Sequence, residues 1–165
     1  MKLALTLILL TASSSWAGYD RTTWGMPLKE VQKLYPDGVV QPKQDKTADY
    51  AVIKSIAGQT AVVLFNFDTT KRLDSVTILF PKAGSSIDLK GERYDAASKA
   101  ESATIYNLLT NLLSQKYGAP ASTNPETGII LWRLDNGDIV GLNKAKDEVG
   151  VGIVYSKGEL PTNGL

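Results

Sequence analysis

The stretch Leu73-Asp74-Ser75-Val76-Thr77-Ile78-Leu79-Phe80 decides how this chain is interpreted, because a later stretch repeats its pattern. Residues Glu148-Val149-Gly150-Val151-Gly152-Ile153-Val154-Tyr155 match it at an offset of 75 residues, which places Ile78 on Ile153. In both stretches, large apolar side chains recur at every second position, as in a β-strand with one buried face. Self-similarity at a fixed offset indicates two copies of one structural unit.

The similarity extends upstream of both strands. The same offset places Phe65 and Phe67 on Val140 and Leu142, and a helical pattern precedes each group of strands. We therefore predict a helix–strand–strand–strand unit that occurs twice, over about residues 24–81 and 95–156. Strands joined by hairpins after one helix predict an α+β fold, in which the helices pack on one face of an antiparallel sheet.

The second helix carries the clearer boundary signals. Ser98 and Glu101 have the spacing of a capping box, and Gly118 is placed for a C-terminal cap. Between them an apolar stripe recurs at helical spacing, which indicates a buried helix face: Ile105, Leu108, Leu109, Leu112 and Leu113. The first helix begins near Pro27 and ends before Pro36, since proline fits the first helical turn but not the interior.

The first 17 residues have the pattern of a signal peptide. Lys2 precedes an apolar run, Leu3 to Leu10, and small residues at Ser15 and Ala17 fit cleavage after Ala17. The run is too short to span a bilayer, so we expect no integral membrane segment in the mature chain. We expect residues 18–165 to form one domain that is soluble and either periplasmic or secreted.

The composition excludes several classes of chemistry. The 165 residues include 18 Lys and Arg, 17 Asp and Glu, and no His or Cys. An imidazole base, a thiolate nucleophile, a disulfide and a zinc–thiolate site are therefore impossible. The balanced charge argues against nucleic acid as a partner. We expect no metal, no cofactor and no enzymatic activity, although a weak carboxylate-based hydrolase stays an alternative.

The turn at Asn136-Gly137 sets the predicted register of the last hairpin. A two-residue type I′ turn there would place Leu134 opposite Ile139 and Trp132 opposite Gly141. Trp132 would then cover a strand glycine on the sheet face that the helices leave open. We predict a binding surface on this open face, made of Trp132, Ile130, Leu134, Ile139, Gly141, Thr77, Gly150 and Gly152.

One short motif resembles a known type of protein. The stretch Trp24-Gly25-Met26-Pro27-Leu28-Lys29-Glu30-Val31 is similar to an opening common in small exported bacterial proteins of unassigned function. The doubled plan resembles the tandem-repeat fold of β-lactamase-inhibitor-like (BLIP-like) proteins and of small outer-membrane assembly lipoproteins. The resemblance to the inhibitors implies binding of an enzyme by the concave face of the sheet.

These observations predict an exported, non-catalytic protein that binds a protein or another macromolecule of the cell envelope through the open sheet face. A second hypothesis is a carrier of a small ligand, such as a lipid or peptide, in the space between sheet and helices. Co-purification of a protein partner would favour the first hypothesis, and a bound lipid detected by mass spectrometry would favour the second.

Overall fold

The computed structural model describes residues 18–43, 48–90, 93–144 and 150–158. The predicted signal peptide and the hairpin tip at 145–149 lie outside these residues. The elements follow one another as α1 (Leu28–Leu34), β1 (Val39–Pro42), β2 (Ala48–Ile56), β3 (Gln59–Phe67), β4 (Leu73–Leu79), α2 (Lys99–Tyr117), β5 (Ser122–Asn124), β6 (Ile129–Arg133), β7 (Ile139–Lys144) and β8 (Val151–Ser156).

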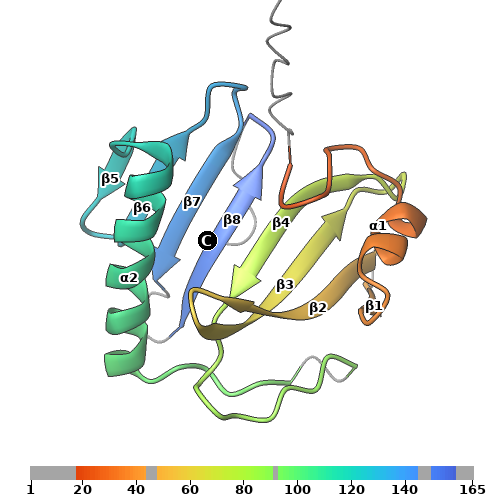
Figure 1. The fold of residues 1–165 in the computed structure, drawn as a ribbon, viewed down its shortest axis with the longest axis horizontal. Coiled ribbons are helices and arrows are strands. Elements are labelled where there is room, and N and C mark those ends of the chain that lie inside the picture. The colour runs from red at the N-terminus through yellow and green to blue at the C-terminus, as the bar shows by residue number, and fades with distance from the viewer. Residues whose placement is uncertain (1–17, 44–47, 91–92, 145–149, 159–165) are drawn as a thin grey trace, which may run out of the picture.

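All eight strands form one antiparallel sheet in the order β1-β2-β3-β4-β8-β7-β6-β5 (Figure 1). The α+β class is therefore confirmed. Each helix precedes four strands, whereas the sequence predicted three. The two missed strands, β1 and β5, lie at the edges of the sheet. Both are short. The β1 strand ends in Pro42 and the β5 strand, Ser122–Asn124, is polar throughout, so neither shows the apolar alternation that is typical of a strand.

The pair β4–β8 joins the first group of strands to the second. Ile78 lies opposite Ile153, and the flanking pairs are Val76 with Tyr155 and Thr77 with Val154. The β4–β8 pair thus lies in the middle of the sheet, with three further strands on each side. Residues of this central pair line the candidate site described below.

Local sequence signals account for the ends of the helices. Ser98 accepts a hydrogen bond from the Glu101 backbone while the Glu101 side chain bonds back to Ser98 N, so the predicted capping box is confirmed. Gly118 ends α2 with φ +82°, a conformation that glycine adopts without steric cost. Within the described residues no helix is long and apolar enough to cross a membrane.

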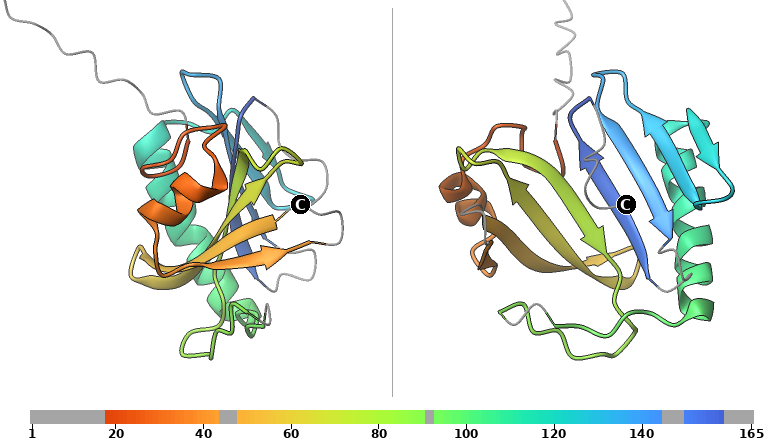
Figure 2. Two further views of the ribbon diagram at one scale, coloured as in Figure 1. Left: turned by 90° about the vertical axis from the view of Figure 1, so that its right-hand side faces the viewer. Right: turned by 180° about the vertical axis from the view of Figure 1, so that it is seen from behind.

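One buried cluster holds side chains from both helices and from one face of the sheet, which we call the helix-side face. Val31 of α1 belongs to it, together with Ile105, Leu109 and Leu113 of α2. Figure 2 shows the two helices on the same side of the sheet, near its opposite ends. The centre of the helix-side face, over β4 and β8, therefore lies between them.

The predicted register of the β6–β7 hairpin was wrong by one residue. Arg133 lies opposite Ile139, and Trp132 lies opposite Val140 instead of Gly141. The connection is a three-residue loop, because Leu134 N donates to Asp138 O and Gly137 N donates to Leu134 O. One extra loop residue turns every β6 side chain to the other face of the sheet.

The side chain of Asn136 explains this choice of turn. Its Oδ1 accepts from Asp138 N at 3.0 Å and its Nδ2 donates to Asp138 Oδ2 at 2.8 Å. The left-handed backbone position falls on Gly137, with φ +86°, and not on Asn136. A type I′ turn requires positive φ at both of these residues, so the structure has the three-residue alternative.

Candidate functional site

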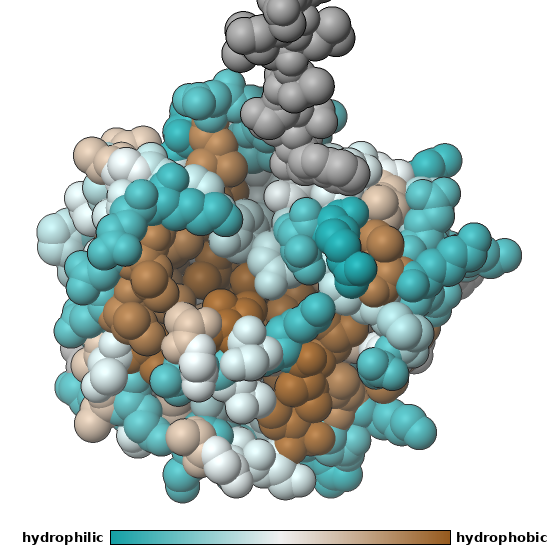
Figure 3. Space-filling model, in the orientation of Figure 1, coloured by the Kyte–Doolittle hydropathy of each residue, from teal (hydrophilic) through white to brown (hydrophobic). Residues whose placement is uncertain are grey.

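An apolar cleft of about 290 Å³ opens on the helix-side face, between α2 and the centre of the sheet. Ile78 and Ile153 form its floor and are almost fully buried. Leu109, Leu112 and Leu113 of α2 form one wall. Figure 3 shows apolar surface gathered in this region around a hollow. A concave, mostly apolar site with a few polar groups is typical of small-ligand binding.

The turn between β2 and β3 forms one end of the cleft. Ile56 and Ala57 line the cleft there, and the turn continues into Gly58. Ala57 has φ +52° and Gly58 φ +76°, so the chain reverses tightly at this point. The lining residues at this end of the cleft carry no charge, which makes it the apolar end.

Aromatic and charged groups gather at the other end, where α2 terminates. Tyr19 and Tyr155 line the cleft with their ring centroids 5.3 Å apart, and Lys116 on the last turn of α2 lines it too. The ammonium of Lys116 is 4.9 Å from the centroid of the Tyr117 ring. The cleft is therefore apolar at the β2–β3 turn and bears hydroxyl and ammonium donors at the C-terminal end of α2.

The tyrosines at this end stay protonated near neutral pH. Burial raises the pKa of Tyr19 to about 12, and the negative charge of Asp20 adds to the effect. Burial also raises the pKa of Tyr155 well above its usual range, and the electrostatic influence of Tyr117 and a hydrogen bond with it raise this pKa further. Each phenol is thus a neutral hydrogen-bond donor, and Lys116 supplies the positive charge on this stretch of the lining.

The predicted binding residues divide between the two faces of the sheet. Trp132 and Ile130 lie on the helix-side face, with exposed fractions of 1% and 7%, and they belong to the core. The Trp132 indole donates to Gly118 O at 3.2 Å, which anchors the end of α2 to β6. Leu134 is half-buried against the same cluster. The predicted cover of Gly141 by Trp132 is therefore wrong.

The other predicted residues lie apart from this cluster. The face of the sheet opposite the helix-side face, which we call the second face, carries Ile139, Gly141, Thr77 and Gly152, as the alternation predicted. All of them except Thr77 are buried, so this face is less open than expected. Gly150 precedes β8 and donates its N–H to the Ser102 hydroxyl of α2 at 2.8 Å.

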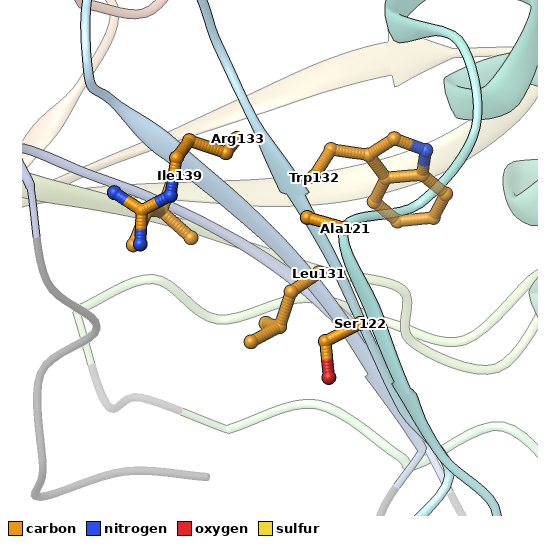
Figure 4. A pocket seen from close by; sticks show the side chains of 6 residues that line it. All are labelled: Ala121, Ser122, Leu131, Trp132, Arg133 and Ile139. Atoms are coloured by element: carbon orange, nitrogen blue, oxygen red, sulfur yellow. The ribbon is translucent and has the colours of Figure 1, made fainter.

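A second hollow, of about 220 Å³, lies over β5, β6 and β7. Leu131, Arg133 and Ile139 line it, next to Ser122 of the edge strand β5. Figure 4 shows the Trp132 indole directed toward α2, away from Leu131 and Arg133. Among the predicted binding residues, Trp132 and Ile139 are the two that line this hollow.

Sequence reasoning missed most of the cleft. Leu109, Leu112 and Leu113 have the spacing of a buried helix face, although Leu112 is 39% exposed. The signal that identifies the cleft is Lys116, which continues this apolar stripe by one helical turn and places a charge at its end. No sequence pattern indicated Tyr19, because it lies outside the segments with helical or strand periodicity.

Within the described ranges, no group of three or more Asp and Glu residues is arranged to hold a metal ion. No family model, curated protein or solved structure matches this chain.

Proposed function

We propose that the protein binds a small apolar or amphipathic ligand, without catalysis, in the cleft between α2 and the centre of the sheet. The observation that carries the proposal is the half-open apolar volume of about 290 Å³ over Ile78 and Ile153. Closing this surface over a ligand removes apolar area from water, which favours binding by about 25 cal/mol per Å² before the entropic costs.

A duplicated unit would account for the position of the cleft, and we keep it as part of the proposal. Each helix would belong to its own group of four strands and pack toward the outer strands of that group. The groups meet at β4 and β8, where Ile78 pairs with Ile153. The middle of the helix-side face would then be the one stretch that neither helix covers.

The test is saturable binding of a neutral fluorescent probe, N-phenyl-1-naphthylamine, to the purified protein. Leu112→Glu places a charge on the wall of the cleft, and we expect the probe to bind about tenfold more weakly or not at all. Ile53→Glu is the matched control, because Ile53 is 49% exposed on the second face. Thermal unfolding checks that both variants fold.

Two outcomes would overturn this function. One is an absence of saturable probe binding to the wild-type protein. The other is binding that Leu112→Glu and Ile53→Glu weaken equally, because the probe would then lie outside the cleft.

A second candidate function is binding of an envelope protein through the second face, in line with the inhibitor-like resemblance. The hollow beside β5 favours it, because Arg133 there offers a guanidinium beside the apolar side chains of Leu131 and Ile139. A partner that co-purifies with the wild type and with Leu112→Glu, but not with Arg133→Glu, would support this candidate. Loss with Leu112→Glu alone would contradict it.

A further inference from the structure

The two ends of the cleft differ in chemistry, which limits the ligands that fit it. Leu109, Leu112, Leu113 and Lys116 follow one another along α2, so the ammonium lies at one end of the apolar wall. Tyr155 lies two residues beyond Ile153 on β8, at the same end. A ligand that satisfies both ends needs an apolar body and one polar head.

The polar end has unused hydrogen-bond donors. Within the described residues, the Tyr19 hydroxyl has no hydrogen-bond partner, while its backbone is held by Thr22. In the same part of the chain, Lys116 contacts the Tyr117 ring and forms no ion pair with a carboxylate. A phenol and an ammonium together donate to a negatively charged oxygen, and such charge-assisted hydrogen bonds are the strong ones.

The charges around this end also favour an anion. Asp20 is the acid next to Tyr19, and its Oδ2 already accepts from the Tyr35 hydroxyl at 2.9 Å. Two cations flank the Tyr35 ring, with Arg21 5.3 Å and Lys54 4.6 Å from the centroid. Arg21 and Lys54 therefore lie close to the hydrogen-bond partner of Asp20, and Lys116 is the positive charge that lines the cleft.

The end of α2 does not cancel this charge. The negative end of the helix dipole lies here, but its exposed carbonyl groups are partly occupied. Ser114 O accepts from Gly118 N at 2.9 Å, and Gly118 O accepts from the Trp132 indole at 3.2 Å.

We infer that the ligand is a single-chain amphiphile with one carboxylate head group, of the fatty-acid class. The carboxylate lies at Lys116 and Tyr19, and the chain runs over Ile78 and Ile153 toward the β2–β3 turn. This inference rests on the proposed function. One free ammonium matches one negative charge, and a cleft of about 290 Å³, small for a ligand site, suits one chain.

The test compares ligands that share one chain and differ in their heads. Decanoate, 1-decanol, decyl phosphate and decyltrimethylammonium are each titrated against bound N-phenyl-1-naphthylamine, below the concentration at which they form micelles. We expect decanoate to bind about tenfold more tightly than 1-decanol, and decyltrimethylammonium to bind most weakly.

Three variants assign this preference to residues. Lys116→Met should weaken decanoate about threefold and leave 1-decanol unchanged. Lys33→Met is the matched control, because Lys33 also lies in the last turn of a helix but does not line the cleft. Tyr19→Phe keeps the aromatic packing and removes the hydroxyl, so decanoate should bind about tenfold more weakly.

The outcomes separate this inference from the function on which it rests. Equal affinity for decanoate and 1-decanol, with no effect of Lys116→Met, overturns the carboxylate inference while probe binding still supports a ligand cleft. Tighter binding of decyl phosphate than of decanoate overturns the choice of head group. An absence of binding by the probe and by all four ligands overturns the proposed function itself.

Discussion

Ile78 and Ile153 lie directly opposite each other across β4 and β8, and they are also the residues that the offset of 75 places on each other in the sequence. An antiparallel pair of strands is related by a local twofold axis that passes between opposed residues. The point where the two matched strands meet is therefore also the floor of the cleft.

The first prediction concerns the buried indole of β6. Trp132→Ala should lower the free energy of unfolding by about 3–5 kcal/mol, because it leaves a cavity and removes the bond to Gly118 O. Urea unfolding measures the loss. Leu131→Ala, on the other face and half-exposed, is the control and should cost clearly less. A larger loss for Leu131→Ala would show that the indole is not in the core.

The second prediction tests the register of the β6–β7 hairpin by disulfide trapping, which is straightforward because the chain has no cysteine. Arg133→Cys combined with Ile139→Cys should oxidise readily, since the two positions are direct partners. Leu134→Cys combined with Ile139→Cys should oxidise poorly, because the side chains would point to opposite faces. Non-reducing electrophoresis measures the extent of disulfide formation in both variants. Readier oxidation of the 134–139 pair than of the 133–139 pair would instead support the two-residue turn.

The third prediction concerns stability at alkaline pH. Burial raises the pKa of both Tyr19 and Tyr35 to about 12, with Asp20 adding to each shift. An unfolded tyrosine loses its proton near pH 10, so between pH 10 and 12 the unfolded chain binds fewer protons and stability falls. Urea unfolding at several pH values should show this fall. The double variant Tyr19→Phe, Tyr35→Phe should show a shallower one, and an unchanged slope would contradict the assignment.

The fourth prediction concerns the start of α2. Ser98→Ala should lower the free energy of unfolding by about 1 kcal/mol, since it removes the acceptor for Glu101 N and half of the capping box. Thr104→Ala, at an exposed position inside the same helix, should stay within about 0.5 kcal/mol of the wild type. Equal losses in the two variants would mean that the cap contributes nothing specific.

The fifth prediction concerns processing. If residues 1–17 are a signal peptide, the protein recovered after export should begin at Gly18, and its intact mass will show this. Ala17→Arg removes a small residue that the peptidase requires, so the precursor should accumulate. Export of a chain that keeps its first 17 residues would contradict the interpretation.

Sequence patterns predicted the features that depend on neighbouring residues. The capping box at Ser98 and the alternation through Val76 and Ile78 are short-range signals, and both agree with the structure. The sheet face on which Trp132 lies depends on a single turn residue. The side chain of Asn136 forms hydrogen bonds with Asp138, and its backbone does not adopt a positive φ. That local choice is not visible in an Asn-Gly pair, which suits either turn.

The cleft was harder to predict for a different reason. Its lining comes from α2, the β2–β3 turn, two strands and Tyr19, which are far apart in the chain and each look like core or loop on their own. Their meeting depends on the order of strands in the sheet, and in particular on β4 pairing with β8. No single segment carries that information.

Gly18 has a practical consequence for experiments on this protein. A Cβ atom at this position would lie 2.2 Å from Thr22 O, so the backbone has no room for any other residue. The neighbouring residue is Tyr19, which lines the cleft. A purification handle fused directly before Gly18 would therefore be tethered next to a residue that lines the cleft, and it should be removed before ligand measurements.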